Sequence, residues 1–129
     1  MKSLKEIVTS VRAAIDSSAE IPDEEELRIA EVWLDFKFPE SYREFVRLGG
    51  LGGLCINHRV FAPSEVLQSL GYLPDHDHVP FADNGCGDLC CWSKSDDAEP
   101  PVMFADHESG YTYSEDAESF TSWLEQNLF

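Results

Sequence analysis

Two short polar segments contain residue types that can hold a divalent metal ion and activate water for hydrolysis. They are Asp75-His76-Asp77-His78 and, about thirty residues later, Asp106-His107-Glu108. Their spacing matches no ligand template, although alternate residues of the first segment would converge if the chain were extended there. We therefore predict no metal and no cofactor, and a metal-dependent hydrolase built on these segments stays open as a third hypothesis.

The cysteines suggest a second kind of chemistry. Cys86, Cys90 and Cys91, with His107, could form a zinc site or a Cys–His nucleophile pair. The spacing lacks the paired knuckles of structural zinc sites, and anionic surroundings disfavour a reactive thiolate. We predict instead that Cys90 and Cys91 lie in a strand buried on both faces, that the chain has no disulfide framework, and that it is not an enzyme.

Composition narrows the kinds of partner. The 129 residues include 25 Asp or Glu and 9 Lys or Arg, for a net charge of −16, and 43% are hydrophobic. This is enough apolar material for one core, so we predict a single domain over residues 1–129. Strong acidity opposes binding to nucleic acid or to anionic membrane surfaces and favours a basic protein partner. With no signal-peptide core and no long apolar run, we expect a cytoplasmic protein.

The front third of the chain predicts three helices. Ser3 and Glu6 form a capping box for the first, over about residues 3–17. The second runs from the carboxylates of residues 23–26 to about Asp35, with an apolar stripe predicted at Leu27, Ile29, Ala30, Trp33 and Leu34. The third covers about residues 40–48 and stops at Gly49 and Gly50.

The remainder predicts short strands separated by turn residues. We place them near residues 54–61, 79–82, 88–93, 101–105 and 111–113, with helices at about 64–70 and 116–127, the last having Asp116 in its acidic start. Helices before and after a mostly antiparallel sheet give an α+β fold, with N-terminal helices and a C-terminal helix packed around the sheet.

Charge is concentrated in the strand-rich part. Residues 1–22 carry three charges of each sign, and the net charge is −4 over 23–48, −2 over 49–82 and −10 over 83–129, where Lys94 is the single cation. One interpretation is solubility, and the other is a field that attracts a cationic surface. Tyr111 and Tyr113 lie beside this acidity and could anchor a protein interface.

Three stretches in this order resemble the SUKH superfamily, which contains fungal cell-wall regulators and bacterial immunity proteins of polymorphic toxin systems. Residues 38–45 with the following glycine pair resemble its Leu-Pro-x-x-Tyr-x-x-Phe helix and turn. Residues 79–89, with Gly87-Asp88, resemble its passage into the central strand, and residues 101–108 with 119–124 its last strands and helix. The family is not known for enzymes, and the resemblance implies that Gly87 and Asp88 are scaffold residues.

The resemblance and the charge together predict an immunity protein that binds and neutralises a cognate toxin domain, basic and of nuclease type. Monomer and homodimer remain open, and the alternative is a regulatory protein-binding adaptor without a toxin partner. Loops carry function more often than packed elements do. The expected partner-binding residues are therefore exposed loop and strand residues of the acidic part: Asp75, Asp77, Asp83, Asp96, Asp97, Asp106, Glu108, Tyr111 and Glu115.

Overall fold

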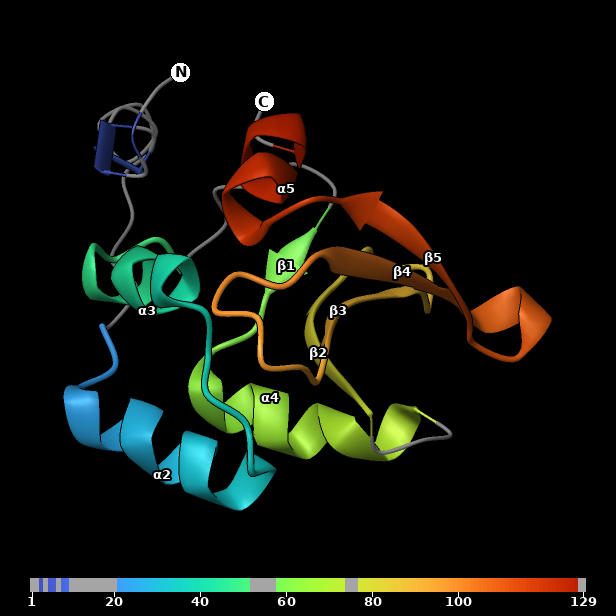
Figure 1. The fold of residues 1–129 in the computed structure, drawn as a ribbon, viewed down its shortest axis with the longest axis horizontal. Helices are drawn as coiled ribbons and strands as arrows, with labels where there is room; N and C mark the ends of the chain where they lie inside the picture. The colour runs from blue at the N-terminus through green and yellow to red at the C-terminus, as the bar shows by residue number, and fades with distance from the viewer. Residues whose placement is uncertain are drawn as a thin grey trace.

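The computed structural model describes residues 3, 5, 6, 8, 9, 21–51, 58–73 and 77–127 (Figure 1). Among these, no helix is long and apolar enough to cross a bilayer. The elements, in chain order, are the helices α2 (Glu24–Leu34) and α3 (Glu40–Arg47), strand β1 (Arg59–Val60), helix α4 (Pro63–Ser69) with the 3-10 turn η1 (Leu70–Tyr72), strands β2 (His78–Asp83), β3 (Leu89–Ser93) and β4 (Val102–Asp106), the 3-10 turn η2 (His107–Ser109), strand β5 (Thr112–Ala117) and helix α5 (Phe120–Asn127).

The five strands form one antiparallel sheet in the order β1-β2-β3-β4-β5, so each strand pairs with its neighbour in the chain. In Figure 1 the sheet lies between α4 and α5, with α2 against α4 and α3 beside α5. This confirms the predicted α+β class. From β2 to β5 the connections alternate between the two ends of the sheet, so the β2–β3 and β4–β5 connections share one end.

Aromatic rings fill the core around β3. Trp92 is fully buried and stacks on Phe81, with ring centroids 4.5 Å apart, and Tyr42 and Phe120 meet it at 5.2 and 5.9 Å. The residues of β3 from Leu89 to Trp92 are all buried, as predicted for its cysteines. Truncating a buried Trp or Phe in such a cluster typically costs about 3–5 kcal/mol, so these rings are structural residues.

The connection between β3 and β4 contacts the C-terminus of α2 and the N-terminus of α3. Lys94 Nζ donates to the carbonyl of Leu34 at 2.8 Å, at the end of α2. Glu99 accepts the backbone N–H of Ser41 at 3.2 Å and also its hydroxyl, at the start of α3. A cation at a helix C-terminus and an anion at an N-terminus both complement the helix dipole. Lys94 and Glu99 therefore serve the fold.

The predicted starts and stops of the early helices are largely confirmed. Ser3 Oγ accepts the backbone N–H of Glu6 at 3.2 Å, the capping contact expected for the first helix, whose residues 10–17 lie outside the described part. Asp23 caps α2 by accepting from Glu26 N at 2.9 Å. After α3, Gly49 has φ of 79°, a left-handed backbone conformation that favours glycine. Of the strand expected at 54–61, residues 54–57 lie outside the described part.

Two boundaries in the last third were predicted wrongly. β5 continues through Ala117, which pairs with Val102, so Asp116 belongs to a strand and not to a helix start. The helix begins at Phe120 because Ser119 Oγ accepts the backbone N–H of Ser122 at 3.2 Å, as an N-cap does. The strand expected at 111–113 is correspondingly longer and starts at Thr112.

The apolar stripe predicted for α2 was also partly wrong. Leu27, Ala30 and Leu34 are buried against the domain, as expected. Ile29 and Trp33 are exposed, Trp33 by 76% of its surface. The helix has apolar residues on two faces, and only one of them packs against α4.

Candidate functional site: the turn end of the sheet

The predicted partner-binding residues do not form a single surface. Two connections, residues 84–88 and 107–111, lie at one end of the sheet, because Asp83 pairs with Leu89 and Asp106 with Thr112 there. We call this the turn end. It carries four of the predicted residues: Asp83, Asp106, Glu108 and Tyr111.

The other predicted residues lie elsewhere. Asp77, Asp96 and Asp97 are exposed near the opposite end of the sheet, where His78 pairs with Ser93. Glu115 is exposed within β5 and faces a shallow acidic depression shared with α5. Asp75 lies outside the described residues. We therefore treat the turn end as the candidate site.

The connection from β4 to β5 is a tight turn closed by its own backbone. Asp106 Oδ1 accepts the backbone N–H of Glu108 at 3.0 Å, and its carbonyl accepts that of Tyr111 at 2.7 Å. Gly110 and Tyr111 both have left-handed backbone, with φ of 74° and 63°. A bulky residue rarely adopts this conformation, and such residues tend to cluster at functional sites. The turn thus holds Tyr111, half-buried, beside the neighbouring connection.

The connection from β2 to β3 is organised by Asn84. Its Oδ1 accepts the backbone N–H groups of Cys86 at 2.9 Å and Asp88 at 3.3 Å, while its amide donates to Asp88 Oδ2 at 3.0 Å. Gly87, with φ of 100°, allows close approach to the ring of His107, since a β-carbon there would lie 3.1 Å from that ring. Its carbonyl accepts the Tyr111 hydroxyl at 3.3 Å.

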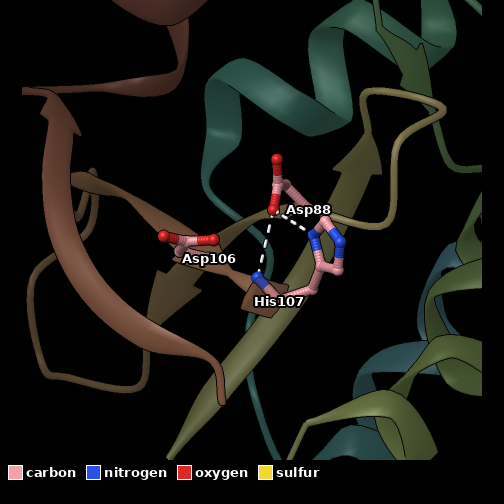
Figure 2. A group of neighbouring side chains, drawn as sticks. All are labelled: Asp88, Asp106 and His107. Atoms are coloured by element: carbon pink, nitrogen blue, oxygen red, sulfur yellow. Dashed lines mark hydrogen bonds and ion pairs between the residues drawn. The ribbon is translucent and has the colours of Figure 1, made fainter. Parts of the chain in front are cut away.

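Asp88 and His107 join the two connections (Figure 2). Asp88 Oδ1 accepts the backbone N–H of His107 at 3.0 Å and faces its Nδ1 at 2.6 Å. The hydrogen bond to Asp88 raises the pKa of His107 above its ordinary value. The reciprocal bond from the His107 ring, with those from Asn84 and the His107 backbone, lowers the pKa of Asp88. Asp88 thus accepts a backbone N–H at the start of β3, as expected of a scaffold residue.

The same residues have the types needed for a metal site. Oxygen and nitrogen atoms of Asp88, Asp106 and His107 lie within 4.8 Å of one another, the single such group in the described part of the chain. In Figure 2, however, the Asp106 carboxylate lies to one side of the Asp88–His107 pair, and no dashed line joins it to either of these side chains. Each carboxylate accepts a backbone N–H, and Nδ1 of His107 is occupied by Asp88. The arrangement fits a hydrogen-bonded clasp joining two loops. Within the described part of the chain, neither His78, which stacks on Tyr113, nor Cys86, Cys90 or Cys91 belongs to this group.

A groove of about 340 Å³ lies between the turn end and α4 with η1. Asp83 and Tyr111 line it from the sheet, and Glu65 and Tyr72 from the helical side. Tyr72 is 65% exposed. Tyrosine and carboxylate side chains around a groove of this size suit a protruding cationic or amphipathic side chain of a protein partner.

Arg59 occupies part of this groove. Its guanidinium lies 4.9 Å from the ring centre of Phe61, forms an ion pair with Glu65 and a second, at 3.4 Å, with Asp83. The groove therefore already holds one guanidinium group, that of Arg59, between an aromatic ring and two carboxylates.

Sequence reasoning missed the helical side of the groove. Glu65 and Tyr72 carry no local motif for binding, and they line the groove because α4 packs beside β2, whereas Arg59 reaches it from β1, where it pairs with Asp83. The exposed aromatic at Tyr72, directly after Gly71, was the available signal for an interface residue.

The comparisons agree with this architecture. Residues 21–126 match the SMI1 / KNR4 family (SUKH-1), which covers most of the chain and includes the helices, the sheet and the turn end. No curated protein and no solved structure matches the chain. The family acts in protein–protein interactions and is not known for enzymes. The chain belongs to the SMI1/KNR4 family of SUKH-1 domains.

Proposed function

We propose that this protein is a cytoplasmic immunity protein that binds and neutralises a cognate toxin domain, with the turn end as its main contact surface. The observation that carries the proposal is the groove at that end, which is lined by Tyr72, Tyr111 and the carboxylates of Glu65 and Asp83, with the exposed Glu108 in the adjoining β4–β5 connection. Interfaces concentrate binding energy in a few aromatic and charged residues of this kind.

Charge supports a basic partner. The net charge is −16, and the cations near the sheet are already engaged: Arg59 by Glu65 and Asp83, and Lys94 by the end of α2. The uncompensated carboxylates attract a cationic surface and speed its association. A nuclease domain needs such a surface to hold phosphates, so an acidic inhibitor can use the same cations for recognition.

Neutralisation by this route requires no chemistry from the inhibitor. The turn end is a hydrogen-bonded scaffold whose polar atoms hold one another, as in the contacts of Asp88 with His107. We propose that the protein binds, covers the partner's active site or blocks access of its substrate, and has neither a cofactor nor a catalytic residue of its own.

The test is calorimetric titration with the carboxy-terminal domain encoded by the neighbouring upstream reading frame, at low and high salt. The proposal predicts nanomolar affinity and loss of the domain's toxicity when both proteins are present. Binding that weakens as salt rises would support the acidic surface. Absence of binding at both salt concentrations would contradict the immunity function and favour the adaptor hypothesis.

A further inference from the structure

The outer face of α2 is apolar and uncovered. Among the described residues, four of the five large exposed hydrophobic side chains, Ile21, Ile29, Val32 and Trp33, lie on α2 or just before it. Val32 is 71% and Trp33 76% exposed. Ile29, Val32 and Trp33 are three and four residues apart and therefore share one side of the helix. A surface helix normally presents polar residues there, and contiguous exposed apolar residues mark contact surfaces.

This face continues into a groove between α2 and α4. The groove has a volume of about 270 Å³ and an apolar floor of Ile29, Ala30 and Leu67. Asp23, Glu25 and Glu26 line its rim at the start of α2. Ile29 belongs to both features, so one partner segment could contact the apolar face and the acidic rim together.

Charge indicates what kind of partner would cover this surface. Residues 23–35 contain six carboxylates and one cation, Arg28, which pairs with Glu25 at 3.6 Å, and Lys37 follows shortly after. Glu24 is engaged by Arg47, and Glu31 by the backbone N–H of Phe38. In a symmetric dimer built on α2, the same acidic surface would face itself, and like charges oppose such contact.

We propose that the outer face of α2, defined by Ile29, Val32 and Trp33, and the adjoining groove bind a cationic amphipathic helix of a protein partner. The apolar face of such a helix would pack on Trp33 and Val32, and its basic side chains would form ion pairs with the carboxylates of the acidic rim. This surface uses none of the residues of the turn end, so the inference stands apart from the toxin proposal.

The fluorescence of Trp33 can report directly whether a peptide covers this face. Trp92 and Trp123 are fully buried, so among the three tryptophans Trp33 is the one that acrylamide quenches readily. The probe is a leucine–lysine peptide about four helical turns long, with its leucines on one helical face. We expect the peptide to protect Trp33 from acrylamide and to shift its emission to the blue. A peptide of the same composition, with its leucines scattered around the helix, should protect it about tenfold less effectively.

Variants separate the apolar contact from plain charge attraction. Val32→Ser, alone or with Ile29→Ser, keeps Trp33 as the reporter and should weaken peptide binding about tenfold. Ser114→Ala changes an exposed residue of β5 that lies on neither the α2 face nor the turn end, and it should leave the affinity unchanged. Far-ultraviolet circular dichroism and urea unfolding of each variant verify that the fold is intact.

Four results would overturn the proposal. Equal protection by both peptides would mean that charge alone drives binding, and no protection by either would mean that the face binds no such helix. Trp33 shielded in the free protein at every concentration would mean that its own chain covers the face. Shielding that grows with protein concentration would mean that a second copy does. None of these results depends on whether a toxin domain binds the turn end.

Discussion

One carboxylate oxygen of Asp88 holds His107 twice, through the backbone N–H at 3.0 Å and through the ring Nδ1 at 2.6 Å. These contacts join the β2–β3 and β4–β5 connections into one unit. Because Tyr111 also bonds the carbonyl of Gly87, the groove wall is built by two loops that cannot move independently without breaking these bonds. The clasp therefore presents Tyr111 and Glu108 in a fixed arrangement.

The first prediction concerns the charge of His107. Its pKa is raised mainly by the hydrogen bond to Asp88, so Asp88→Asn should lower it toward or below the ordinary value of 6.5. A titration of the histidine ring protons by NMR measures this directly. His58, whose pKa is lowered chiefly by burial, is an internal control and should keep its value. An unchanged His107 pKa would show that Asp88 does not hold the ring.

The second prediction is a pH dependence of stability. Because the pKa of His107 is raised in the folded protein, its contribution is complete below about 6.5 and declines as pH rises through the folded value. Because the pKa of Asp88 is lowered, its contribution is complete above about 3.8 and declines in stronger acid. The Asp88–His107 pair therefore contributes most to the free energy of unfolding between about pH 3.8 and about pH 6.5.

Urea unfolding of the wild type and His107→Asn checks this. The difference in the free energy of unfolding should be larger at about pH 5 than at about pH 8.5, because the imidazole carries more positive charge at the lower pH. A difference that grows toward alkaline pH would contradict the assigned direction of the His107 shift.

The third prediction tests the close approach of the two loops. Gly87→Ala should lower the free energy of unfolding by about 2 kcal/mol, since it combines a left-handed backbone with a β-carbon 3.1 Å from the His107 ring. Gly85→Ala is the matched control, with φ of 77° and open space around the added carbon, and should cost about 1 kcal/mol. Equal costs would mean that His107 can move aside freely.

The fourth prediction assigns Lys94 to the fold and not to binding. Lys94→Ala removes the bond to the Leu34 carbonyl and should lower the free energy of unfolding by about 1 kcal/mol. Lys37→Ala removes the same charge from an exposed position and should change it by less than about 0.5 kcal/mol. Removal of either cation should not slow association with a basic partner. Equal stability of the two variants would contradict the capping role of Lys94.

Sequence patterns predicted the boundaries of helices and strands well where contacts between residues close in the chain determine those boundaries. Asp23 and Gly49 mark a helix start and a helix stop, and both act within a few residues of their own position. The boundary between β5 and α5 failed because the pairing of Ala117 with Val102 is non-local and outweighed the acidic pattern of residues 115–118. The side of α2 that is buried depends on where α4 lies, which the apolar spacing of Ile29 and Trp33 does not encode.

The candidate site was predicted in part. Asp83, Asp106, Glu108 and Tyr111 were expected from charge and loop position, and they share the turn end. Asp96 and Asp97 lie at the opposite end because the hairpin connections alternate between the two ends of the sheet, Asp77 directly precedes β2 at that end, and Glu115 lies within β5. The helical wall of the groove depends on the packing of α4 beside β2, so apart from the aromatic at Tyr72 no local pattern indicates it.

Charge reversal at the two ends of the sheet tests most directly whether the turn end receives the partner. Glu108→Lys and Asp96→Lys each reverse one exposed carboxylate, one at the turn end and one at the opposite end. Neither side chain caps a helix or turn in the described structure, unlike Asp106, whose reversal would also break its bond to Glu108 N. The pair therefore differs in position more than in its effect on folding.

The measurement is the association rate of each variant with the upstream-encoded domain, by stopped-flow fluorescence at low and at high salt. We predict that Glu108→Lys slows association about tenfold at low salt, that Asp96→Lys changes it by less than about twofold, and that high salt removes the difference. Equal slowing by both variants, or greater slowing by Asp96→Lys, would contradict the assignment of the turn end as the contact surface.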